Sequence, residues 1–269
     1  NASGPDLPSL IKIALQFSGQ DKKEVNSLAK QLATTPKLFN VETVFDVDLK
    51  AGIADIPSLS IEALGMSTSA KLKAKKINSS TPILNGELEA SGPDLPLIIQ
   101  IVQGIQKTNS EFLKISKNLG KVKSKSFNIK TSFDADLSSG KIDLPSLSFD
   151  TLGISINGNL KGKNIHKNSG SMKGSISIIS KTPKPLLIAL GQIDIAEVLK
   201  SIDINTGISG NTSSVELKPL SLSAVFSGKN IPNSPVELKI RADSEINLGK
   251  EILNLDSLQV SGLGLDVKG

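Results

Sequence analysis

The sequence predicts a mainly β protein with short helices, built as an elongated, curved antiparallel sheet that forms a repeated open hydrophobic groove. Three observations predict this fold class. Apolar and polar residues alternate along several segments, and long motifs recur at a fixed spacing. The apolar residues are also almost entirely aliphatic, with 8 Phe and no Tyr or Trp among 269 residues. The hydrophobic fraction of 38% is sufficient for a core.

Internal repetition is the strongest of these observations. Three motif pairs are separated by 88 residues: SGPDLP at 3–8 and 91–96, FDVDL at 45–49 with FDADL at 133–137, and IPSLSIEALGM at 56–66 with LPSLSFDTLGI at 144–154. Aligned without a gap, 41–66 and 129–154 agree at 13 of 26 positions. A weaker copy, LDSLQVSGLGL at 255–265, follows at an offset of 111 residues. The extra length falls where TPKPLLIALGQIDIAEVLKSID predicts a longer helical insertion.

The repeats divide the chain into four parts. Residues 1–38 are expected to form the helical end of a preceding unit, and 39–126 a first unit of strands plus a helix. Residues 127–210 form a second unit with the longer helix, and 211–269 a divergent, truncated third unit. We therefore expect a segment of a longer array.

Within each unit the alternation has a period of two. In FNIKTSFDADL, the residues Phe127, Ile129 and Phe133 share one face with Ala135 and Leu137, while polar residues occupy the other. Such one-faced alternation is typical of antiparallel sheets with a single wet face. The residues expected to line the groove are Phe45, Val47, Leu49, Met66, Leu72, Phe127, Ile129, Phe133, Ala135, Leu137, Ile154, Ile156, Ile176, Ile178, Leu238 and Ile240.

Turn and helix signals lie between the strands. SGPDLP predicts a helix start, with Asp as N-cap and Pro in the first turn, followed by helices over 7–16 and 95–106. Gly65, Gly153 and Gly264 each follow a leucine at a strand end, where glycine permits a bend or bulge as the chain turns to the next strand.

The composition argues against an enzyme. There is no Cys and one His, His166, so thiolate chemistry and a His-based triad or metal site are excluded. Two same-face pairs, Asp46 with Asp48 and Asp134 with Asp136, resemble a carboxylate dyad or metal site, but a solvated outer face is the favoured interpretation. We expect no catalytic residue, cofactor or metal. Nucleic-acid binding is not expected either, because stacking aromatic residues are missing.

Two arrangements of the apolar faces remain open. A closed sandwich would bury these faces against each other, whereas an open curved sheet would expose a trough lined by Leu, Ile and Val. The formal charge of +5 is ordinary for a soluble protein, and a preference for anionic head groups is its alternative interpretation.

The order FDADL, LPSLSFDTLGI, a basic or glycine-rich strand, then SGPDLP before an apolar helix resembles the AsmA family of Gram-negative envelope proteins. The resemblance covers 3–16, 39–105 and 127–193, and more loosely 236–265. It implies a periplasmic segment of an inner-membrane-anchored protein, with the anchor outside this segment. It also implies a β-groove that binds acyl chains and helps transfer phospholipid between the inner and outer membranes. The protein partners stay unknown. The alternative function is a structural or interaction scaffold, such as an adhesin-like module with a closed core.

Overall fold

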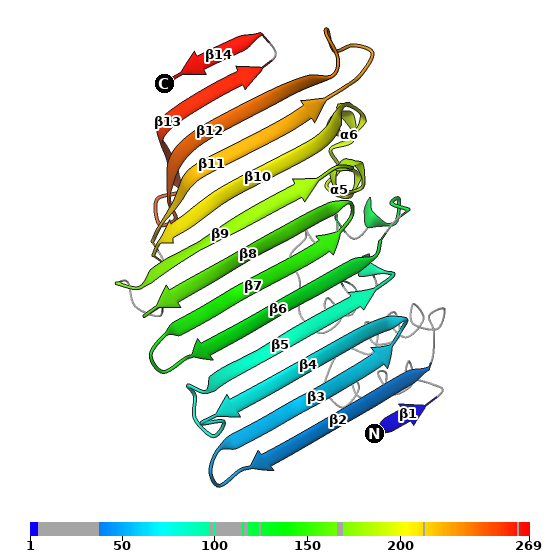
Figure 1. Cartoon of the computed structure of the whole chain (residues 1–269), viewed down its shortest axis with the longest axis vertical. Helices are drawn as coiled ribbons and strands as arrows, with labels where there is room; N and C mark the ends of the chain where they lie inside the picture. Colours follow the sequence, from blue (N-terminus) through cyan, green and yellow to red (C-terminus); the bar gives the residue numbers. More distant parts are fainter. Residues whose placement is uncertain are drawn as a thin grey trace.

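The structure is a computed structural model that describes residues 1–4, 38–96, 99, 115, 118–123, 125–165, 169–211, 213–262 and 264–269. All described strands belong to one antiparallel sheet, in which spatial order follows chain order from β1 to β14. Figure 1 shows a single layer of strands with the two termini at opposite ends of its long axis. The predicted mainly β antiparallel fold is confirmed, and the described strands do not divide into two sheets of a sandwich.

The strand bounds repeat as regularly as the sequence does. Each of the four strands β2 to β5 begins and ends 88 residues before its counterpart among β6 to β9. The strands are β1 (Ala2–Gly4), β2 (Phe39–Asp48), β3 (Ile53–Ala63), β4 (Met66–Lys75), β5 (Ile83–Gly92), β6 (Phe127–Asp136), β7 (Lys141–Thr151), β8 (Ile154–Lys163), β9 (Ser171–Ser180), β10 (Leu199–Gly210), β11 (Ser214–Phe226), β12 (Val236–Asn247), β13 (Ile252–Gly262) and β14 (Leu265–Lys268).

The helical insertion lies between β9 and β10. It forms two six-residue helices, α5 (Lys184–Ala189) and α6 (Ile193–Val198), which lie at one end of the strands in Figure 1. Gly191, with a φ of 77°, separates them. The helix expected over 7–16 and the single histidine, His166, lie outside the described residues, as does most of the helix expected over 95–106.

The leucine–glycine pairs form tight turns. Leu64–Gly65 joins β3 to β4, and Leu152–Gly153 joins β7 to β8. All four residues have positive φ, between 51° and 78°, as a two-residue type I′ hairpin turn requires. Leucine is unusual in this conformation, yet both leucines are buried, at 4% and 6% exposure. The glycines therefore allow the backbone conformation of the turn, and the buried leucine side chains pack the turn against the rest of the protein.

Prolines mark an irregularity that recurs along the sheet. The register shifts at Ile56–Leu59, Leu144–Leu147 and Leu217–Leu220, and each segment contains a proline, Pro57, Pro145 or Pro219. Proline has no N–H to donate to the ladder, so it occurs in strands where the pairing is interrupted. These bulges therefore occur in β3, β7 and β11, four strands apart.

Among the described residues, the buried hydrophobic cluster lies at one end of the strands. Leu119, Val122, Leu152 and Ala189 form a buried cluster between the β7–β8 turn and α5. The accessible surface of the chain is 16595 Å², about 1.5 times the roughly 11,000 Å² of a compact monomer of this mass. The single layer of described strands exposes both of its faces and so contributes to this surface.

Candidate functional site

One face of the sheet is apolar along its length. Residues paired across neighbouring strands point to the same face, so the registers can be followed from strand to strand. One such row crosses the thirteen strands from β2 to β14, and only its threonine is polar: Val41, Ile61, Thr68, Ala90, Ile129, Phe149, Ile156, Ile178, Ile204, Leu222, Ile240, Val260 and Val267.

The opposite face is polar. A row on that face crosses β2 to β13: Asp46, Asp55, Lys73, Asn85, Asp134, Asp143, Lys161, Lys173, Ser209, Glu216, Glu245 and Asn254. Moving one residue along each strand reaches the apolar face again, at Val47, Ala54, Ala74, Leu84, Ala135, Ile142, Gly162, Met172, Gly210, Val215, Ile246 and Leu253. The two faces therefore differ in chemistry through twelve consecutive strands.

Most of the residues predicted to line the groove lie on this apolar face. Thirteen of them lie in the registers of β2, β4, β6, β8, β9 and β12. Phe45 lies at the register shift between β2 and β3, and Leu49 and Leu137 lie in the turns that follow β2 and β6. The residues are spread over much of the sheet and do not converge on one pocket.

Burial divides these residues. Phe127 and Ile154 are buried, at 6% and 8% exposure, whereas Phe45 and Leu49 are 65% and 67% exposed. Most of the others are half-buried. The polar exceptions on the apolar face have small side chains: Thr43, Thr68, Thr131, Thr151, Thr206, Ser180 and Ser244.

Sequence reasoning missed a large share of this face. Ile204, Leu220, Leu222 and Val260 in β10, β11 and β13 belong to it, and their alternation along each strand was the signal that could have identified them. The sequence reasoning also missed glycines on the apolar face, which contribute no side chain to it. One of them is Gly158, which pairs with Leu147 and Ile176.

Ion pairs cross the polar face from strand to strand. Lys73 lies 3.4 Å from Asp55, and the pair repeats 88 residues later as Lys161 and Asp143 at 3.3 Å. A hollow on this face is lined by charged and hydroxyl side chains: Ser58, Ser69, Lys71, Glu87, Glu89, Lys130, Ser132 and Ser146. A hollow of this chemistry suits water and ions better than an apolar ligand.

Two of the four predicted outer-face aspartates have a structural role. Asp48 Oδ1 accepts hydrogen bonds from the backbone N–H groups of Lys50 and Ala51, each at 2.9 Å. Asp136 accepts the equivalent bonds from Ser138 and Ser139 at 2.9 and 3.3 Å. The Ser138 hydroxyl also donates to Asp136, and this bond is the main cause that lowers its pKa to about 2. These carboxylates hold the β2–β3 and β6–β7 turns.

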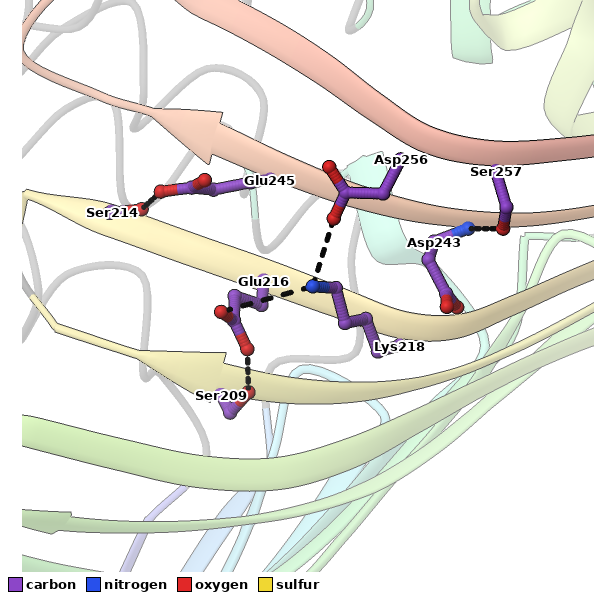
Figure 2. Close-up of polar contacts among 8 residues, drawn as sticks. All are labelled: Ser209, Ser214, Glu216, Lys218, Asp243, Glu245, Asp256 and Ser257. Carbon is purple, nitrogen blue, oxygen red and sulfur yellow. Dashed lines mark hydrogen bonds and ion pairs between the residues drawn. The ribbon is translucent and has the colours of Figure 1, made fainter. Parts of the chain in front are cut away.

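A polar network spans β10 to β13 at the third bulge. Figure 2 shows Lys218 between Glu216 and Asp256, with its Nζ 2.9 Å from the Asp256 carboxylate. This contact is the main cause that raises the pKa of Lys218. Nearby, the backbone N–H of Asp243, at a register shift, donates to Ser257 Oγ at 3.3 Å. Side chains thus supply bonds where the backbone ladder is interrupted.

Searches for family models, curated proteins and solved structures gave no match to the chain. Among the described helices, none is long and apolar enough to cross a bilayer. Within the same residues, no group of three or more acidic, His or Cys side chains is placed to hold a metal ion. The continuous apolar face is therefore the feature from which a function can be argued.

Proposed function

We propose that this chain is a periplasmic segment of an AsmA-like, inner-membrane-anchored protein of a Gram-negative bacterium. Its apolar face forms a repeated open groove that binds acyl chains and helps transfer phospholipid between the inner and outer membranes. The observation that carries the proposal is the apolar register row through thirteen strands, on a sheet whose other face is charged. The family resemblance of the repeated motifs supplies the compartment and the cargo.

The energetics of lipid transfer favour such a surface. Exposing an acyl chain to water costs about 0.8 kcal/mol per CH₂, so a 16-carbon chain costs roughly 12 kcal/mol. Contact with an aliphatic face offsets much of this cost without a catalytic group or cofactor. Half-buried side chains suit this task because they are covered when a lipid binds and still form part of the sheet when it leaves.

The uniform lining supports movement along the sheet. Neighbouring strands lie about 4.8 Å apart, so fourteen of them span roughly 60 Å. Each strand that the apolar row crosses carries aliphatic side chains on this face. An acyl chain therefore meets similar contacts at each step, and no single position binds it much more tightly than the others. The head group remains in water beside the sheet.

Photo-crosslinking at neighbouring positions tests the proposal. A photo-reactive residue at Phe133 lies on the apolar face, and one at Ser132 lies on the polar face of the same strand. With the protein made in Gram-negative cells, we expect phospholipid adducts by mass spectrometry at Phe133 and a much lower yield at Ser132. Equal yields at both positions would contradict a lipid-binding face. A lipid-free protein without adducts would favour the scaffold alternative.

A further inference from the structure

The outer edge of β2 is partly open. In the second unit, β5 pairs with the equivalent strand β6 along its full length, from Ile83–Asp136 to Gly92–Phe127. In the first unit, β1 pairs with β2 only at 39–41. Figure 1 accordingly shows β1 beside one end of β2. Among the described residues, no strand pairs with this edge of β2 along 42–48.

The open part of the edge exposes apolar side chains. Phe45 and Val47 are 65% and 43% exposed. Their counterparts 88 residues later, Phe133 and Ala135, are half-buried beside β5. The same motif is therefore covered in one unit and uncovered in the other, and the difference between the two is a neighbouring strand.

Phenylalanine–glycine contacts indicate which residue a neighbouring strand needs opposite each phenylalanine. Phe127 and Phe133 each pair with a glycine of β5, Gly92 and Gly86. A Cβ built on either glycine would lie 2.8 Å from the phenylalanine ring, closer than real Cβ contacts allow. Phe39 and Gly4 show the same arrangement, at 2.6 Å. In each pair the ring occupies the place of the missing side chain.

Phe45 is the fourth phenylalanine of this series, and no glycine faces it among the described residues. We propose that the β2 edge at 42–48 binds an antiparallel strand of the β5 type, with glycine opposite Phe45 and aliphatic residues opposite Thr43 and Val47. Such a strand continues the existing β1–β2 pairing. Its backbone hydrogen bonds supply affinity, and the alternating side chains supply specificity.

The chemistry of the edge distinguishes this partner from a second copy of the chain. The polar side of the edge bears Glu42, Asp46 and Asp48, so it favours a strand with neutral or basic residues at those positions. Among the described residues, a second copy would offer three open edges of its own: β2, β13 along 252–257, and β14. None of these contains a glycine to place opposite Phe45, and β2 would add like charges. A β5-type strand fits better, and this inference is independent of lipid binding.

Extending the full chain tests the inference. The sequence of Ile83–Leu88 joined directly before Asn1 continues β1 in register and places its glycine opposite Phe45. The matched control carries the same extension with that glycine changed to valine. We expect the glycine extension to slow amide exchange in 42–48 by about tenfold or more, and the valine extension to leave it near the parent value. Phe45→Ala in the glycine-extended chain should restore fast exchange.

Exchange in β6 to β9 monitors the fold in every variant. Three results would overturn the inference. Equal protection by both extensions would show that glycine is not required, and protection by neither would show that the edge does not accept this strand. Concentration-dependent protection of 42–48 in the parent chain would identify a second copy as the occupant.

Discussion

At the residue scale, the buried turn leucines set two effects against each other. Leu152 adopts a φ of 51°, a left-handed conformation that costs a non-glycine residue about 1–2 kcal/mol. Its side chain is also packed with Leu119, Val122 and Ala189. Burying a leucine stabilises a protein by roughly 1.5–3 kcal/mol, and truncating one costs more because a cavity remains. Packing therefore exceeds backbone strain at this position.

A pair of substitutions at this turn measures that balance. Leu152→Ala should lower the free energy of unfolding by about 2–4 kcal/mol. Leu152→Asn suits the left-handed conformation better, yet we expect it to destabilise as well, because it removes the same packing. Urea denaturation of both variants measures the two losses. A stabilised Asn variant would show that backbone strain, not burial, dominates the turn.

Asp136 gives the turn between β6 and β7 a pH dependence. Its pKa is lowered from 3.8 to about 2, chiefly by the hydrogen bond from Ser138. Since the unfolded chain then binds more protons than the folded chain, the stabilisation is complete above about pH 4 and is lost as the pH falls toward 2. Asp136→Ala should therefore lower Tm at neutral pH, with a difference from the parent that disappears between pH 4 and 2.

Asp134→Ala is the matched control for this experiment. Asp134 lies two residues earlier on the same face, and its carboxylate makes an exposed contact with the Lys141 ammonium group at 3.9 Å. Exposed ion pairs contribute little to stability. A pH-dependent loss of equal size in both variants would contradict a specific role for Asp136 in the turn.

At the element scale, close strand packing depends on glycine. A Cβ built on Gly86 would lie 2.6 Å from the Lys71 carbonyl oxygen and 2.8 Å from the Phe133 ring. Gly174, 88 residues later, makes the same approach to the Asn159 carbonyl oxygen. Both glycines lie in the last strand of a four-strand unit, β5 or β9, so the constraint belongs to the unit and not to one site.

Gly86→Ala tests this constraint. The added methyl group meets backbone on one side, which cannot rotate away, so we expect a loss of roughly 1–3 kcal/mol in unfolding free energy. The control is Gly249→Ala in the β12–β13 turn, where a Cβ would meet only Asn247 Oδ1 at 3.7 Å. That change should stay within about 0.5 kcal/mol of the parent. Similar losses at both positions in chemical denaturation would refute the close approach.

The strands were the part of the fold that the sequence predicted best. Alternation and the 88-residue spacing identified the strands around Phe45 and Phe133. Each side chain in these strands faces either the apolar or the polar side of the sheet, so its chemistry shows which side it faces. The bulges at Pro57, Pro145 and Pro219 were not foreseen, although proline inside a strand motif is their cause. The lining residues of β10 and β11 were missed because 199–226 has no close copy elsewhere in the chain. Whether the face is covered depends on long-range packing, which no local pattern specifies.

At the scale of the whole molecule, each strand depends on its immediate neighbours. Among the described strands, spatial order follows chain order, so no pairing between distant strands closes the sheet. Repeat proteins built this way have stabilities that are approximately sums of unit and interface contributions. We therefore expect the chain to unfold in parts rather than as one cooperative unit.

Hydrogen exchange on a variant of the second unit tests this expectation. Gly174→Val should clash with the backbone of β8 and speed amide exchange in β8, β9 and β10. The strands β3 and β4 lie four or more strands away in the sheet, so their exchange should match the parent. In the parent itself, the half-open strands β2 and β13 should exchange faster than β6 to β8, because 42–48 and 252–257 pair on one side only among the described residues. A uniform increase across all strands would instead mean that the sheet unfolds as a single cooperative structure.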